Sequence, residues 1–166
     1  MAVTGCTQTP KVVKYGGARE ERYAYVDGEV YSMGDLIRIS TTGTVELAEA
    51  NSAGAVHGIA LSAGTTGETT VPVLLFASDT VIAIQTIDTK TPADIDVGSI
   101  YTLEVSSGLN GVTDTTTNGV AMCVDKPATD QPWADTTGTY DVASDTANGI
   151  VYVRIIQSVL DGTVAA

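Results

Sequence analysis

Three kinds of residue in this 166-residue chain could do chemistry: one histidine, two cysteines and twenty carboxylates. His57 is the only histidine, which excludes a multi-histidine metal centre and any triad that needs a second histidine. Cys6 and Cys123 are far apart in the sequence, and two cysteines so placed indicate free thiols in a reducing compartment. The sequence has no Gly-rich phosphate loop and no nucleophile motif. We therefore expect no catalytic residue, no metal ligand and no cofactor.

The best candidate for a functional carboxylate is Asp35, which follows Gly34 in a predicted turn. A similar stretch later in the chain has Ser99 after Gly98. A catalytic or metal-binding carboxylate would not be exchanged for a hydroxyl while its turn was kept, so Asp35 is expected to accept hydrogen bonds from the N–H groups of its own turn.

His57 precedes a glycine, as Asn118 does in the later stretch, and this pattern favours a turn role over catalysis.

Residues 127–148 contain four aspartates, no basic residue and Trp133, the only tryptophan. The spacing of these aspartates does not match the alternating acids of a calcium loop. A large aromatic side chain on an acidic loop is typical of a contact residue, which makes Trp133 a candidate for a subunit interface. The alternative is that Trp133 folds back and closes one end of the barrel, and the sequence does not decide between the two.

Two parts of the chain share one order of short apolar runs separated by turns. Runs of this length with β-branched residues, bounded by Gly, Thr, Ser and Asn, predict strands. The repeated order indicates one four-strand unit used twice. The aligned stretches are 33–39 with 97–103, 41–43 with 106–108, 57–61 with 118–122, and 71–75 with 151–155.

We therefore predict an all-β fold: a small antiparallel β barrel or sandwich built from two similar halves, with an extended N-terminal arm over residues 1–24. The body covers 25–160, with half one at 25–90 and half two at 91–160, and residues 161–166 form a loose tail. Aligned positions lie 61 residues apart at Gly58 and Gly119 but 80 apart at Val73 and Val153. This difference predicts an insert of about 19 residues within 127–148.

The net charge of −12 would repel DNA and anionic lipid, which argues against a nucleic-acid or membrane role. No apolar run of seven or more residues follows the start, so we expect no signal peptide. The first 22 residues carry a net charge of +2, whereas the other 144 carry −14. Such asymmetry between one end and the body often marks an interaction arm.

Within this arm, residues 11–15 predict a short strand that adds to the sheet of a partner. Four basic residues would steer the approach to that partner. If so, a chain that starts at Tyr23 should still fold but lose its partner. The candidate binding residues are Lys11, Val12, Val13, Lys14, Tyr15, Arg19 and Arg22.

Four motifs occur in a fixed order in the first half: Gly-Asp-Leu-Ile at 34–37, Thr-Gly-Thr-Val at 42–45, His-Gly-Ile-Ala at 57–60 and Gly-Glu-Thr-Thr-Val-Pro-Val at 67–73. This order resembles the head-decoration, or capsid cement, proteins of tailed bacteriophages, with residues 97–156 as a looser second copy. The resemblance implies a non-enzymatic structural protein of the virion that is made in the host cytoplasm and lies on the outer surface of the capsid. It also implies two partners, the major capsid protein and further copies of this chain in a homotrimer, with the arm forming part of the attachment.

Two other classes of function remain open. One is a fibre or adhesin module that binds a glycan or a partner protein, which would require aromatic side chains clustered on one exposed face. The other is an enzyme on a small β barrel, which the missing catalytic motif argues against.

Overall fold

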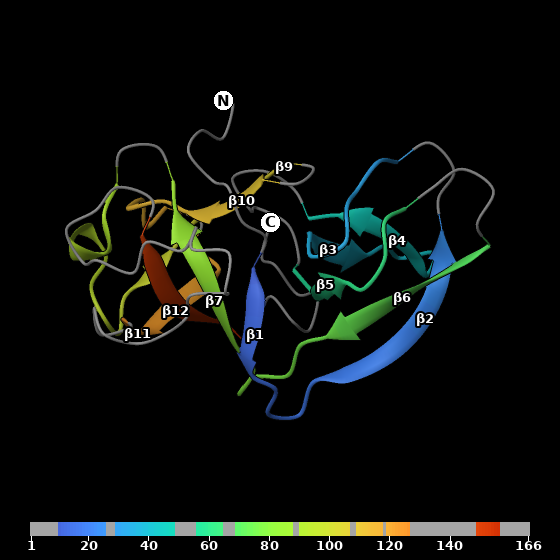
Figure 1. Ribbon diagram of the computed structural model, residues 1–166, viewed down its shortest axis with the longest axis horizontal. Coiled ribbons are helices and arrows are strands. Elements are labelled where there is room, and N and C mark those ends of the chain that lie inside the picture. The colour runs from blue at the N-terminus through green and yellow to red at the C-terminus, as the bar shows by residue number, and fades with distance from the viewer. Residues whose placement is uncertain are drawn as a thin grey trace, which may run out of the picture.

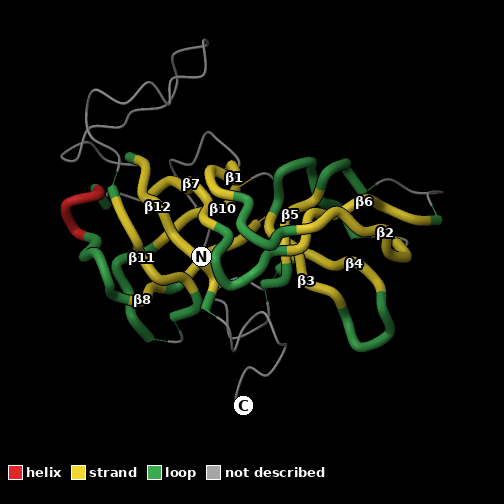
Figure 2. The backbone as a smooth tube through the Cα atoms, turned by 90° about the horizontal axis from the view of Figure 1, so that it is seen from below, coloured by secondary structure: helices red, strands yellow, loops and turns green. Residues whose placement is uncertain are grey.

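The computed structural model describes residues 10–25, 29–48, 56–64, 69–87, 90–106, 109–117, 119–126 and 149–156. These residues contain twelve strands and one 3-10 helix, Pro92–Asp94, so the predicted all-β fold is confirmed. The strands form two groups that lie side by side along the longest axis of the molecule (Figure 1). The perpendicular view shows the same division (Figure 2).

The first group is a closed barrel of five short strands. They are β2 (Arg19–Tyr25), β3 (Leu36–Ile39), β4 (Thr44–Leu47), β5 (Gly58–Ala60) and β6 (Thr70–Leu75), in the order β2-β4-β3-β5-β6. All neighbours are antiparallel except β2 and β4, which are parallel. Alternate side chains point inward, and the buried interior is formed by Tyr31, Ile37, Val45, Ala60, Val71 and Val73.

The second group contains β7 (Val81–Thr86), β8 (Ile100–Tyr101), β9 (Leu103–Ser106), β10 (Leu109–Val112), β11 (Ala121–Asp125) and β12 (Ile150–Ile155). Its order is β8-β11-β12-β7-β10-β9, and a seventh strand, β1 (Lys11–Lys14), pairs with β7 off this path. The two end strands, β8 and β9, are consecutive in the chain and separated by Thr102 alone. The sheet therefore curls round until its two ends meet, and together β8 and β9 take the place that β3 has in the first barrel.

The same topology thus occurs twice, which confirms the prediction of two similar halves. The parallel pair β7–β10 repeats β2–β4, and the antiparallel pair β7–β12 repeats β2–β6. The repeated unit has five strands, however, and the predicted boundaries are wrong. Half one begins at Arg19, and β7 belongs to half two. The start of β2 escaped prediction because residues 19–22 are all charged and show no apolar alternation.

Backbone hydrogen bonds fix which residues of the two halves correspond. The Ala60 carbonyl accepts from the glycine N–H that precedes β3, and the Cys123 carbonyl accepts from the glycine N–H that precedes β8, both at 2.8 Å. Ala60 therefore corresponds to Cys123, and the predicted match of Gly58 with Gly119 is wrong by two residues. A strand repeats its faces every two residues, so a slip of two leaves the apolar pattern unchanged. The extra length before β12 becomes about 17 residues.

The prediction of an extended arm over residues 1–24 is wrong for the part that the structure describes. Lys11–Lys14 forms strand β1, which pairs antiparallel with β7 of the same chain. Residues 19–24 pair with β6 along the wall of the first barrel. Val12 also packs against the larger core cluster, so burial holds this segment on its own sheet. The strand formation was predicted correctly, but its partner is the chain's own β7.

The two barrels share a hydrophobic core and a buried polar contact. The larger core cluster combines Leu36 and Leu74 from the first half with residues of the second. Asp35 lies fully buried between the halves and accepts from Ser32 N at 2.7 Å, which confirms the turn role predicted for it. Its other oxygen accepts from Asn110 Nδ2 at 2.8 Å, and Asn110 Oδ1 accepts from Leu36 N at 3.1 Å. The contact ties the halves into one unit.

Candidate binding surface

A pocket of about 370 Å³ opens in the first barrel beside the start of β2. Its lining combines four apolar side chains with a guanidinium, a phenol and an imidazole. Such a combination suits the binding of an apolar side chain, with polar groups that fix its orientation. The lining residues are Gly17, Arg19, Tyr23, Ile39, His57, Leu75, Phe76 and Ala77.

The outer wall of the pocket is fixed by bonds between the β1–β2 turn and the β6–β7 link. Thr80 Oγ1 donates to the Tyr15 carbonyl at 2.9 Å and accepts from Ala77 N at 2.9 Å. Gly17 N donates to Asp79 Oδ1 at 3.0 Å. The two links therefore hold each other in place where they border the pocket.

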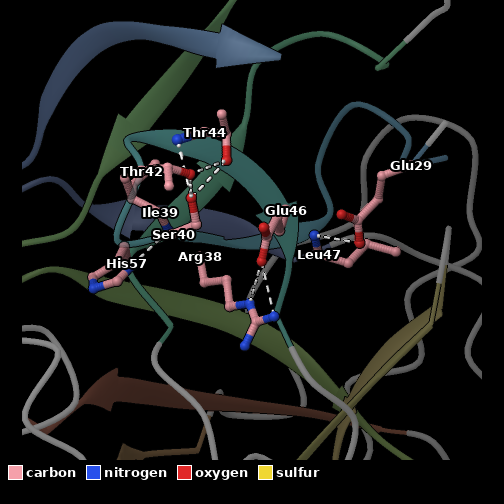
Figure 3. Close-up of polar contacts among 9 residues, drawn as sticks. All are labelled: Glu29, Arg38, Ile39, Ser40, Thr42, Thr44, Glu46, Leu47 and His57. Carbon is pink, nitrogen blue, oxygen red and sulfur yellow. Dashed lines mark hydrogen bonds and ion pairs between the residues drawn. The ribbon is translucent and has the colours of Figure 1, made fainter. Parts of the chain in front are cut away.

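His57 lines the pocket and is held by the backbone of β3. Its Nδ1 accepts from Ile39 N at 2.7 Å (Figure 3). The backbone N–H of His57 donates to the Ile37 carbonyl at 2.9 Å. Burial, and then the nearby Arg38 guanidinium, lowers the pKa of His57. The neutral ring therefore carries its proton on Nε2 and has no free lone pair to act as a base. The structure places His57 directly before the first residue of β5, where it corresponds to Val120 and not to Asn118.

Glu21 joins the two polar side chains of β2 that line the pocket. Its carboxylate lies 2.6 Å from Arg19 Nε and accepts from Tyr23 Oη at 2.8 Å. Burial, and then this hydrogen bond, raises the pKa of the Tyr23 phenol. The three side chains alternate along one face of the strand and present a connected polar rim.

The hairpin of β3 and β4 forms a stiff wall next to the pocket. Arg38 Nε donates to Glu46 Oε2 at 2.9 Å, and these two residues are cross-strand partners (Figure 3). The hydroxyls of Ser40, Thr42 and Thr44 bond to one another around the turn. The charges and hydroxyls of this hairpin are therefore paired within it.

The contacts described above do not activate a nucleophile at this surface. Burial raises the pKa of the Cys123 thiol and keeps it protonated. Across the described ranges, no three His, Cys, Asp or Glu side chains are arranged to hold a metal ion.

The predicted binding residues separate into two groups in the structure. Lys11 to Lys14 lie on β1 beside the second barrel, and Tyr15, 61% exposed, follows them. Arg19 lines the pocket, whereas Arg22 lies on the opposite face of β2. Trp133, the aspartates of 127–148 and the tail at 161–166 lie outside the described residues.

The sequence did not indicate that Tyr23 and His57 line one pocket. It also did not distinguish Glu20 of β2 as a candidate binding residue. The pocket depends on the pairing of β2 with β6, about fifty residues apart in the chain, which no local pattern encodes. One signal was present: four consecutive charged residues on a strand indicate a strand with an exposed edge.

Comparison with models of known protein families and with curated protein sequences found no match to this chain. No helix within the described ranges is both long enough and apolar enough to cross a membrane.

Proposed function

We propose that this protein is a capsid decoration protein that binds the outside of a phage head and stabilises the shell by bridging major capsid subunits. One observation carries the proposal. The glycine turn of the Gly-Asp motif, the first of the four motifs that carry the resemblance, begins the second strand of both barrels with the same backbone geometry, as Gly34-Asp35 in the first and as Gly98-Ser99 in the second.

Gly34 and Gly98 have φ values of 93° and 91°, a region that glycine enters without strain. The N–H of Gly34 donates to the Ala60 carbonyl on β5, the strand that pairs with β3, at 2.8 Å. The N–H of Gly98 donates to the Cys123 carbonyl on β11, the strand that pairs with β8, also at 2.8 Å. Neither residue contacts a candidate catalytic group in the described structure. This glycine turn is therefore a folding device that starts a strand of a small barrel, and it is used twice.

The surface chemistry supports a role in binding. The first barrel combines an open pocket with two ion pairs beside it, Arg19–Glu21 and Arg38–Glu46. The net charge of −12 disfavours the packaged nucleic acid as a partner and favours a protein surface.

Co-sedimentation tests the proposal. Full-length protein is mixed with decoration-free heads of the phage that carries this chain, in the expanded and unexpanded forms, and pelleted. We expect saturable binding to expanded heads, together with an increase in the temperature at which those heads break open. If the amount that pellets does not exceed that found without heads, the proposal is wrong.

A further inference from the structure

The two barrels differ at one edge, although their strands correspond one to one. Val73 of β6 pairs with Glu21, and Val153 of β12 pairs with Ile82. Because Val73 and Val153 occupy the same position in the two halves, Glu21 of β2 corresponds to Ile82 of β7. By the same register, Glu20 corresponds to Val81 and Arg22 to Ala83.

In the second half, the other edge of β7 is covered along its length. β10 pairs at Gln85 and Thr86, and β1 pairs at 81–83. In the first half, β4 covers only Ala24 and Tyr25. Among the residues that the structure describes, no strand pairs with Glu20–Arg22 on that side.

The backbone groups along this uncovered stretch point outward. Pro72, the β6 partner of Arg22, has no N–H, and its carbonyl accepts from Leu61 N on β5's side at 3.1 Å. Arg22 and Pro72 therefore exchange no backbone hydrogen bonds. Hydrogen-bonded and non-hydrogen-bonded pairs alternate along an antiparallel ladder, so Glu20 and Leu74, two residues further on, also form a non-hydrogen-bonded pair. The N–H and C=O groups of Glu20 and Arg22 therefore face the open edge, where they can pair with an added strand.

The pocket lies beside this edge. In the second half, Val12 of β1 stands opposite Ile82 and packs into the core. A residue opposite Glu21 would likewise share the face of Arg19 and Tyr23, which line the pocket of the first barrel. The first barrel thus has an open edge beside a pocket, whereas the second has β1 and its valine at the corresponding edge.

We propose that the Glu20–Arg22 edge binds an extended segment of a partner protein as an added antiparallel strand, with an apolar side chain entering the pocket. Cross-strand charge pairing defines the segment further. An acidic residue belongs opposite Arg22 and a basic residue opposite Glu20, with the apolar residue between them. The segment therefore has the order acidic, apolar, any residue, basic, with the spacing that β1 shows across its bulge.

A second copy of β1 fits this edge less well. It would bring Lys11 against Arg22, and β1 is already paired with β7. The inference rests on the proposed function only for the source of the segment, which would be a shell subunit.

Two peptides of identical composition test the proposal. Both derive from residues 10–15: Pro-Glu-Val-Val-Lys-Tyr has the predicted order, and Pro-Lys-Val-Val-Glu-Tyr has it reversed. Each is titrated into ¹⁵N-labelled full-length protein, with the amides of Glu20 and Arg22 followed by NMR. We expect the first peptide to shift these amides and to bind about fivefold or more tightly than the second, which corresponds to roughly 1 kcal/mol from two cross-strand pairs.

Two variants sharpen the result. Exchanging the charges, Glu20→Arg with Arg22→Glu, should invert the preference between the peptides. Arg22→Pro removes one outward N–H without removing a bond to β6, so it should abolish binding while the thermal melt stays close to that of the unchanged protein. If Arg22→Pro fails to fold, the charge exchange still decides.

Equal affinities for the two peptides, an unchanged preference after the charge exchange, or shifts confined to β7 would overturn the proposal. Self-association that excludes both peptides would overturn it in favour of a second copy as the occupant. No shell is present in this titration, so its failure leaves capsid binding untouched. Conversely, if phage heads failed to bind the protein, peptide binding at the Glu20–Arg22 edge would still stand as a separate result.

Discussion

At the scale of single residues, His57 supports the first barrel in one protonation state. Nδ1 accepts from Ile39 N only while that nitrogen is unprotonated, and burial favours the same neutral form. The unfolded chain has no such restriction and takes up a proton near the ordinary pKa of 6.5. Since its folded pKa is lowered, the contribution of His57 to stability is complete above 6.5 and is lost as the pH falls below it.

We therefore expect the free energy of unfolding to fall between pH 7.5 and pH 5.5, and to fall less in His57→Asn. Asparagine keeps a side-chain acceptor near Ile39 N but does not titrate. Because His57 is the only histidine, urea titrations of the two proteins across this range report on it almost alone. Parallel pH profiles would show that the lowered pKa makes no contribution to folding.

Asn110 is the second residue with a measurable role, since it joins the two barrels through Asp35. Asn110→Ala removes a donor from a buried carboxylate and leaves Leu36 N without this acceptor. Hydrogen bonds to charged groups contribute about 1.5–3 kcal/mol, and a buried group left unsatisfied costs a similar amount. We expect a loss of about 3 kcal/mol in chemical denaturation.

Asn110→Asp is the matched control for that measurement. It keeps the size of the side chain but places a second carboxylate beside Asp35, so it should destabilise the protein at least as much at neutral pH. A loss below about 0.5 kcal/mol for Asn110→Ala, the range of ordinary surface changes, would show that the contact does not hold the halves together.

At the scale of strands, β1 and β2 have unequal importance. A chain that starts at Gly16 loses β1 and the Tyr15 carbonyl that accepts from Thr80, whereas one that starts at Tyr23 also loses four of the six β2 residues paired with β6. We expect the first chain to fold with a loss of about 2 kcal/mol, from the valine burial and the ladder bonds of one short strand. The second should lose the closed barrel, contrary to the expectation from sequence alone.

Circular dichroism and urea unfolding of the two truncated chains check this difference. If the chain starting at Tyr23 unfolds cooperatively and close to the full-length protein, β2 is dispensable and the first 22 residues can act as a separate arm after all.

The strands that sequence analysis located are those that carry their own signal. Gly34 and Gly98 mark turns, and the apolar runs after them must be buried. The start of β2 carries no such signal, because its place is set by backbone pairing with β6 and its charged side chains need no core. The pocket and the open edge follow from that pairing, so they could not be predicted either. The two-residue slip between the halves arose because apolar alternation alone cannot detect it.

At the scale of the whole molecule, we expect self-association into a homotrimer. A single 17.1 kDa chain offers little area for a grip on a shell, whereas specific interfaces need about 800 Å² on each partner. Joining three chains multiplies weak contacts through effective concentration. Sedimentation equilibrium should give about three times the chain mass, and a monomer at tens of micromolar would contradict a trimer in solution.

The position of β7 has a mechanical consequence. β1 and β12 lie on opposite sides of β7, and both run antiparallel to it, so they run parallel to each other. Tension applied at the start of β1 and the end of β12 therefore acts along the strands, in opposite directions. Under this shear geometry the ladder bonds of each pair share the load, whereas unzipping would break them one at a time. A protein stretched between two points of an expanding shell would resist along its stiffest direction.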